Sequence, residues 1–238
     1  MISTILKGLV VVLITIVVSL GAIIVTPLEK SGRAYHWHAR IWSKIVLWLF
    51  GIKVTVHGLE HLKSGKHFIY VSNHASMFDI PTVMGSIPDE IRIVMKKELT
   101  RIPIFGWALK IGHYITIDRD NPKDAMKSLD LAAEKIRNGA SVLLFAEGTR
   151  TRDGKLQPFK RGAFSLAAKS GVPIIPVAIN GTYRILRKGS WKIQPADIML
   201  ILDKPIPTEG IGGKEDELKL MERVHAVIKK NLTGIYSD

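Results

Sequence analysis

The stretch HFIYVSNHASMFDIPTVMGS, residues 67–86, combines a short apolar run, a polar loop and a second apolar run. Its first part, His67–Val71, predicts a buried strand because it is apolar and rich in residues that favour strands. Its last part, Asp79–Ser86, predicts a helix, since an aspartate followed two residues later by Pro81 is typical of a helix N-terminus. A strand that runs through a short loop into a helix is the building unit of an α/β domain.

The same alternation of strand and helix patterns continues along the chain beyond residue 51. Pro122 and Gly139 mark the start and the end of one helix by the residue preferences of helix termini. We therefore expect an α/β domain whose mixed, largely buried sheet is flanked by helices. The expected strands are Lys53–His57, His67–Val71, Ile91–Met95, Tyr114–Ile117, Val142–Ala146, Ile174–Ile179 and Ile198–Leu202. The expected helices are Asp79–Ser86, Ile104–Ile111, Pro122–Asn138, Gly162–Lys169 and Lys214–Asn231.

An uncharged segment precedes this domain. Residues Leu9–Thr26 read LVVVLITIVVSLGAIIVT, which is 18 residues without a charge. That length is near the lower limit for crossing a bilayer, where about 20 residues are typical. The segment is either a membrane anchor or a cleaved signal peptide, and the lack of a small-x-small cleavage site favours the anchor. Its length does not distinguish a helix that spans the bilayer from one that lies within one leaflet.

A second apolar segment, Tyr35–Phe50, has an apolar residue at every fourth position and holds three of the five tryptophans. The recurring positions are Trp37, Ile41, Ile45 and Leu49. This spacing predicts a helix, and tryptophan favours the headgroup region, so we expect an interfacial helix; a buried core helix is the alternative. The chain therefore divides into membrane-anchoring helices over residues 1–51 and an α/β domain over residues 52–238. The excess of Lys and Arg after the first segment predicts that this domain lies on the cytoplasmic side of the cell membrane.

The charge balance favours an anionic partner. Lys and Arg total 34 against 21 Asp and Glu, a formal net charge of +13. Such a chain suits nucleic acid, an anionic membrane surface or a phosphorylated substrate. The chain has no cysteine, which excludes disulfides, cysteine-based zinc sites and thiol nucleophiles. A membrane-tethered nucleic-acid-binding protein is one hypothesis, although the sequence contains no nucleic-acid-binding motif.

The loop of the opening stretch holds His74 five residues before Asp79. Because a strand-to-helix loop turns, the two side chains can meet, and a carboxylate beside an imidazole fixes its tautomer and supports its positive charge. His74 would then act as a general base; the alternative is that Asp79 only caps the helix. The chain has no Gly-x-Ser-x-Gly, H-E-x-x-H or Walker pattern, so no protein nucleophile and no metal are expected. We therefore expect the base to deprotonate a substrate hydroxyl.

A second candidate site is VLLFAEGTR, residues 142–150, where a strand runs into a glycine-bearing turn. Ligands of open α/β sheets bind at the carboxyl ends of the strands. Gly148 lets the backbone approach a ligand, Thr149 offers a hydroxyl, and Arg150 presents a planar fork suited to phosphate oxygens. Glu147 either orients Arg150 or holds a substrate hydroxyl. The alternative is a solvated basic loop in which Glu147 and Arg150 are paired.

Basic and apolar residues alternate in KKELTRIPIFGWALK, residues 96–110. Such a mixture suits an anionic lipid, and surface lysines beside a buried helix are the alternative. Arg119 follows just past an expected strand.

Together these stretches resemble the lysophosphatidic acid acyltransferase family, the 1-acyl-sn-glycerol-3-phosphate acyltransferases. Four motifs of that family occur in order over residues 73–177, and none departs from its pattern. Asn-His-x4-Asp is matched by Asn73, His74 and Asp79. Lys-x2-Leu-x3-Pro-x2-Gly is matched by Lys96, Leu99, Pro103 and Gly106. Glu-Gly-Thr-Arg and Val-Pro-Ile-x-Pro-Val are matched by residues 147–150 and 172–177.

The resemblance implies transfer of a fatty acyl group from an acyl thioester to the 2-hydroxyl of lysophosphatidic acid, giving phosphatidic acid for phospholipid synthesis. It implies that His74 is the base, that Asp79 orients it, and that the Glu147–Arg150 loop binds the phosphate. Lys96 and Arg119 are further candidates for substrate binding. The implied donor is acyl-CoA or acyl-carrier protein, with membrane lipids as partners and without cofactor, metal or nucleic acid. A related acceptor, such as glycerol-3-phosphate or another lysophospholipid, stays open.

Overall fold

A computed structural model of the protein describes residues 2–29, 32–63, 65–112, 114–117 and 122–234. At its centre is a seven-stranded sheet with the strand order β1-β7-β6-β2-β5-β3-β4. Neighbouring strands are parallel except for β6 and β7, which are antiparallel, so the prediction of a mixed α/β sheet is confirmed. The strands are β1 (Val54–His57), β2 (Ile69–Ser72), β3 (Ile91–Lys96), β4 (Ile115–Ile117), β5 (Ser141–Phe145), β6 (Ile174–Asn180) and β7 (Ile198–Leu202).

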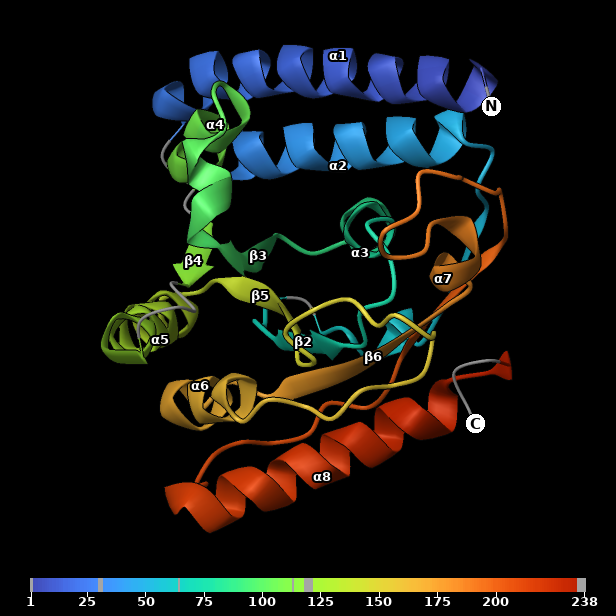
Figure 1. Ribbon diagram of the computed structural model, residues 1–238. Coiled ribbons are helices and arrows are strands. Elements are labelled where there is room, and N and C mark those ends of the chain that lie inside the picture. Colours follow the sequence, from blue (N-terminus) through green and yellow to red (C-terminus); the bar gives the residue numbers. More distant parts are fainter. Residues whose placement is uncertain (1, 30–31, 64, 113, 118–121, 235–238) are drawn as a thin grey trace.

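Helices cover both faces of the sheet (Figure 1). On one side lie α1 (Ile2–Val25), α2 (Arg33–Leu49), α3 (Asp79–Ser86) and α4 (Phe105–Ile111). On the other side lie α5 (Pro122–Arg137), α6 (Gly162–Ser170) and α8 (Gly213–Asn231). The expected strands and helices of the α/β domain are all present, with ends that differ by at most two residues. The sequence did not predict α7 (Thr182–Ile185), because a single turn is too short to show helical periodicity.

Two apolar clusters form the core, one on each face of the sheet. Successive residues of β2 alternate between them: Tyr70 belongs to the cluster that includes Val83 of α3, and Val71 belongs to the cluster that includes Phe164 of α6. All seven residues of β6 are buried. A strand covered on both faces reads as a continuous apolar run, which is why these strands were visible in the sequence.

Helix α2 packs against α3, and its most buried face is not the stripe expected from the sequence. Leu47 is buried, and Ser43 is fully buried, where α2 lies against Gly85 of α3. Trp37, which belongs to the expected stripe, is 60% exposed, and the other three positions, Ile41, Ile45 and Leu49, are half-buried. Trp48, on the same helix, is 79% exposed. α2 therefore belongs to the core on one face and displays tryptophan on another, and its interfacial position stays a prediction. The domain division at residue 51 stays a prediction.

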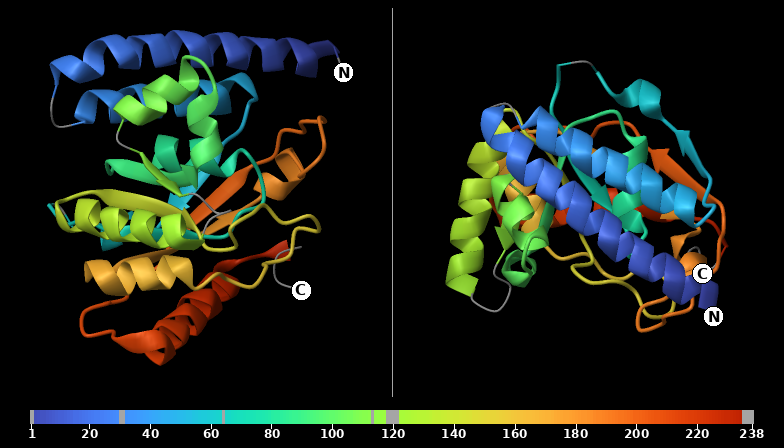
Figure 2. Two further views of the ribbon diagram at one scale, coloured as in Figure 1. Left: turned by 60° about the vertical axis from the view of Figure 1, so that its left-hand side comes forward. Right: turned by 90° about the horizontal axis from the view of Figure 1, so that it is seen from above.

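Helix α1 lies along α2 at the outside of the molecule (Figure 2). The segment Thr4–Leu28 is long and apolar enough to cross a membrane, by length and composition. It is joined to α2 by the indole N–H of Trp42, which donates to Thr15 Oγ1 over 2.8 Å. Leu9 and Leu13 are 63% and 60% exposed, so the outer face of α1 is apolar and uncovered within the described chain.

Candidate active site

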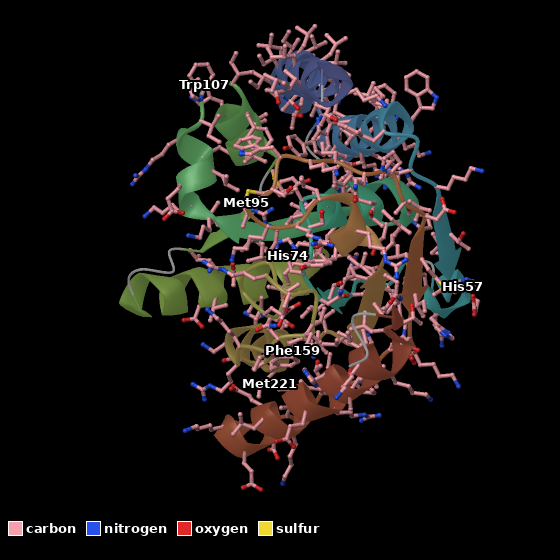
Figure 3. All side chains as sticks on the ribbon, turned by 45° about the vertical axis from the view of Figure 1, so that its right-hand side comes forward. His57, His74, Met95, Trp107, Phe159 and Met221 are labelled. Atoms are coloured by element: carbon pink, nitrogen blue, oxygen red, sulfur yellow. The ribbon has the colours of Figure 1, made fainter. Side chains whose placement is uncertain are left out.

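The candidate site lies where the carboxyl ends of β2 and β5 meet. These strands are parallel neighbours, and Ser72 at the end of β2 is level with Phe145 at the end of β5. The loops that follow, which carry His74 and the Glu147–Arg150 turn, therefore start side by side, although they are far apart in the sequence. In Figure 3 His74 lies between Trp107 on the α1 side of the molecule and Phe159 on the opposite side.

His74 and Asp79 are in direct contact. The Nδ1 atom of His74 lies 2.7 Å from Oδ2 of Asp79, whose side chain is fully buried. The same Oδ2 accepts the backbone N–H groups of Ala75 (2.8 Å) and Ser76 (2.9 Å). Asp79 therefore does not cap α3, the helix that it begins, but caps the preceding loop and holds the imidazole in one orientation. A carboxylate at Nδ1 makes that nitrogen the donor and leaves Nε2 as the proton acceptor.

The remaining surface of the imidazole is partly covered by an aromatic ring. Phe145 stacks on His74 with ring centroids 3.9 Å apart and an angle of 16° between the planes. The His74 side chain keeps 17% of its surface exposed, and no described residue hydrogen bonds to its Nε2. A base whose free nitrogen is the exposed one can reach a substrate hydroxyl. The role of Phe145 could not be predicted from the sequence, because the sequence does not show which residue an aromatic ring at the end of a strand will contact.

The segment Glu147–Thr151 holds the peptide groups of His74 on both sides. The N–H of His74 donates to Glu147 Oε1 over 2.6 Å, and its carbonyl accepts the N–H of Thr151 over 2.9 Å. Glu147 Oε2 accepts the N–H of Gln157 over 3.1 Å. Each carboxylate oxygen of Glu147 is thus bound to a backbone donor, and among the described residues no ion pair joins Glu147 to Arg150.

The buried position of Glu147 affects its ionisation. Its side chain is 3% exposed, and burial raises its pKa from 4.5 to about 7. The two backbone N–H groups, from His74 and Gln157, favour the charged form and oppose that rise. Glu147 is therefore a buried residue that holds the backbone of His74 in place.

Asn73, the first residue of the Asn-His motif, fastens the loop to β6. Its side-chain amide donates to the carbonyl of Ile179 over 3.0 Å and accepts the N–H of Ile179 over 2.8 Å. Asn73 is 2% exposed, so these two bonds are protected from water. The Asn73 side chain thus extends the pairing of β2 with β6 by two hydrogen bonds beyond the end of β2. The sequence placed Asn73 in a family motif but did not reveal this structural role.

Positive charge gathers at the Glu147–Arg150 turn. Gly148 has a φ of +73°, in the left-handed region that favours glycine, and an added Cβ would come 3.2 Å from Lys160 Nζ. Lys188, from the chain after α7, donates to Thr149 Oγ1 (2.8 Å) and to the carbonyl of Arg150 (3.1 Å). Lys188 lies 38 residues from Arg150 in the sequence and was not among the predicted site residues. Glycine, a hydroxyl and nearby cations suit an anionic group.

The other two expected substrate-binding residues are less closely tied to His74. Lys96 is exposed at the carboxyl end of β3, the strand beside β5, and no described contact joins it to His74 or to the Glu147–Arg150 turn. Arg119 lies outside the described residues. In the same motif as Lys96, a Cβ on Gly106 would come 2.5 Å from the carbonyl oxygen of Thr100, so glycine is required for that close approach. Within the described chain, no group of His, Asp or Glu side chains is arranged to hold a metal.

Known proteins resemble this chain in sequence and in fold. A family model described as Acyltransferase matches residues 53–180. The 1-acyl-sn-glycerol-3-phosphate acyltransferase BAT2, chloroplastic, of Brassica napus is 38% identical over 77% of this chain and 52% of its own length. The 1-acyl-sn-glycerol-3-phosphate acyltransferase of Pseudomonas aeruginosa is 31% identical over 89% of this chain and 82% of its own length. The chain thus spans about half of the first relative and most of the second.

A solved structure extends this likeness over nearly the whole fold. The crystal structure of the 1-acyl-sn-glycerophosphate (LPA) acyltransferase PlsC from Thermotoga maritima superposes with a TM-score of 0.83. The two chains are 27% identical, and the match covers 97% of this chain and 93% of the other. The family match includes both loops of the candidate site, residues 73–79 and 147–150. The chain belongs to the 1-acyl-sn-glycerol-3-phosphate acyltransferase family.

Proposed function

We propose that this protein transfers a fatty acyl group from an acyl thioester to the 2-hydroxyl of 1-acyl-glycerol-3-phosphate, which gives phosphatidic acid. The observation that carries the proposal is the 2.7 Å contact between His74 Nδ1 and Asp79 Oδ2, in a loop bound through the His74 peptide groups to the Glu147–Thr151 segment. The relatives described above, which are all named for this acceptor, support its identity.

In the proposed reaction His74 acts as a general base. Its Nε2 takes the proton of the acceptor hydroxyl while the hydroxyl oxygen forms a bond to the thioester carbonyl carbon. The carbonyl electron pair moves onto oxygen, and Asp79 stabilises the imidazolium that forms. When the carbon–oxygen double bond re-forms, the carbon–sulfur bond breaks, and the departing thiolate takes the proton from His74. The products are an ester and a free thiol, and no covalent enzyme intermediate is needed.

The acceptor phosphate is assigned to the Glu147–Arg150 turn. The guanidinium of Arg150 presents parallel N–H donors that match phosphate oxygens, and Thr149 adds a hydroxyl. Glu147, with both oxygens bound to backbone N–H groups, acts by positioning His74. Lys96 and Arg119 are proposed as further substrate-binding residues.

The membrane supplies the acceptor and receives the product. The apolar outer face of α1 and the exposed tryptophans of α2 support binding to a bilayer, with the α/β domain on the cytoplasmic side of the cell membrane. Acyl-CoA and acyl-carrier protein are both anionic donors, and a net charge of +13 would speed their encounter with the enzyme.

The test uses the purified full chain in detergent. Lysophosphatidate is supplied with acyl-CoA or with acyl-carrier protein, and the release of free thiol and the formation of phosphatidate are followed. We expect His74→Ala to lower the rate by about 100- to 10,000-fold, the range that a general base contributes. Glycerol-3-phosphate and lysophosphatidylcholine as alternative acceptors identify which substrate the enzyme prefers.

A matched control is His57→Ala. His57 is exposed and lies at the carboxyl end of β1 (Figure 3). Because β1 runs in the opposite direction to β2, His57 lies at the opposite end of the strands from His74. This variant should keep the wild-type rate. The proposal is wrong if no acceptor supports thiol release, or if His74→Ala is as active as His57→Ala.

A further inference from the structure

Lys188 lies against the phosphate-binding turn without belonging to any of the four sequence motifs. Its ammonium group donates to Thr149 Oγ1 over 2.8 Å and to the carbonyl oxygen of Arg150 over 3.1 Å. The segment that carries Lys188 is also fixed to the loop of His74, because the hydroxyl of Ser76 donates to the carbonyl of Leu186 over 2.9 Å. Lys188 is therefore held at the junction of the base and the turn.

The charge of Lys188 is not compensated within the described chain. Both of its hydrogen-bond partners are neutral oxygens, and no carboxylate among the described residues forms an ion pair with Lys188 or with Arg150. An ammonium has three N–H donors, of which these contacts use two. Lys188 and Arg150 are both half-buried, so their positive charges are only partly screened by water.

We propose that Lys188 binds the phosphate of the acceptor together with Arg150, and that this pair makes the enzyme prefer a phosphomonoester to a phosphodiester. The inference rests on the proposed function and adds a residue and a selectivity to it. A phosphomonoester carries a charge of about −1.5 to −2 at neutral pH. Arg150 neutralises one negative charge, and Lys188 adds a second positive charge at the same turn. A phosphodiester head group carries one negative charge, so it gains less from the second cation.

The experiment compares variants of the full chain in detergent with wild type. Lys188→Met removes the charge and the donors at similar length, and it should raise the KM for lysophosphatidate by about 10- to 100-fold, as expected for a charge-assisted hydrogen bond. The KM for the thioester donor should stay unchanged. The ratio of turnover with lysophosphatidate to turnover with lysophosphatidylglycerol, a phosphodiester, should fall. Lys188→Arg should restore most of the lost affinity, because it keeps the charge.

Lys192→Met is the matched control. Lys192 lies in the same segment and is exposed, so this variant loses the same charge without touching the turn. Both KM values should stay within about twofold of wild type, as for a surface change away from the site. Glycerol-3-phosphate, a soluble phosphomonoester, should inhibit wild type and Lys192→Met more strongly than Lys188→Met.

Three results with the variants would overturn the proposal, and a fourth, with wild type, would contradict the proposed function on which it rests. The acceptor KM of Lys188→Met could equal that of Lys192→Met, or the donor KM could rise instead, which would assign Lys188 to the phosphates of the donor. A lower melting temperature and a lower kcat with an unchanged acceptor KM would make Lys188 a structural link of the turn. If the wild-type enzyme releases no thiol with any acceptor, the proposed function itself is contradicted. If wild type is active, the KM values of the Lys188 and Lys192 variants decide the role of Lys188.

Discussion

His74 is held at each of its polar groups except one ring nitrogen, within the part of the chain that the structure describes. Glu147 binds its N–H, Thr151 binds its carbonyl, and Asp79 binds Nδ1, while Phe145 covers one face of the ring. A side chain fixed in this way needs little further ordering when the substrate arrives, so the base is pre-organised for proton transfer.

The substitution Asp79→Asn separates the two roles of this carboxylate. An asparagine carbonyl still accepts the N–H groups of Ala75 and Ser76, so the loop and the melting temperature should change little. The negative charge that stabilises the imidazolium is lost, and kcat should fall about a thousandfold or more. Asp79→Ala should lower both the activity and the melting temperature. A wild-type kcat in Asp79→Asn would show that this residue serves only as a cap.

The aromatic contact of His74 predicts a smaller effect. Phe145→Leu removes the stacked ring but keeps an apolar side chain, and kcat should fall about two- to tenfold, the equivalent of one aromatic pair. The KM for either substrate should not change. Phe159→Leu is the comparison, because Phe159 stacks on Phe164 elsewhere in the core, with centroids 6.1 Å apart. It should lower the melting temperature and leave kcat unchanged; equal kcat values for the two variants would contradict a role for the stacking.

The buried Glu147 makes the stability of the protein depend on pH. Burial raises its pKa from 4.5 to about 7, so the folded protein binds this proton more tightly than the unfolded chain. Its contribution to stability is full below about pH 4.5 and is lost as the pH rises to about 7. The free energy of unfolding of Glu147→Gln, minus that of wild type, should therefore increase by up to about 3 kcal/mol over this interval. Denaturant titrations in detergent from pH 4.5 to pH 8 measure it, and a constant difference would contradict it.

At the scale of elements, the site is a set of loops tied to the central strands. β2 carries the base, β5 carries the turn, and β6 anchors the loop of the base through Asn73. Asn73→Ala breaks both bonds to Ile179 and leaves two buried backbone groups without partners, which should cost about 2–4 kcal/mol of unfolding free energy. Asn138→Ala, at an exposed position after α5, should stay within about 0.5 kcal/mol of wild type. Similar losses in the two variants would show that the Asn73 bonds are unimportant.

The strands could be predicted because buried strands are continuous apolar runs, as in β6, and the pair His74–Asp79 could be predicted because a short loop limits how far apart its side chains can lie. The partners of that pair could not be predicted. Phe145 and Lys188 lie at the site because of the order of the strands in the sheet, which the sequence does not show. In a chain with 34 Lys and Arg, nothing in the sequence distinguishes Lys188 from the other basic residues. The most buried face of α2 was missed for the same reason, because it depends on where α3 lies.

At the scale of the whole molecule, apolar surface is concentrated on one side. α1 and α2 lie together there, and the exposed side chains of α1 include Leu13, at 60% exposure. Leu13→Arg places a charge on this face, at a cost of about 3 kcal/mol if the residue enters the hydrocarbon region. The fraction of the protein that sediments with lipid vesicles should fall.

The control for this prediction is Leu131→Arg on α5, which lies away from α1. Leu131 is 61% exposed, so the same substitution is made at nearly the same exposure. Its vesicle binding should match wild type. If the two variants bind alike, the surface of α1 does not contact lipid.

The bond between Asn73 and Ile179 joins positions 106 residues apart. A ribosome must therefore release Ile179 before the loop of the base can be fastened, whereas α1 leaves the ribosome much earlier. On the proposal that α1 anchors the enzyme, this helix can meet the bilayer while the loop of His74 still lacks its bonds to Ile179. The proposed attachment to the membrane would then precede the assembly of the candidate active site during biosynthesis.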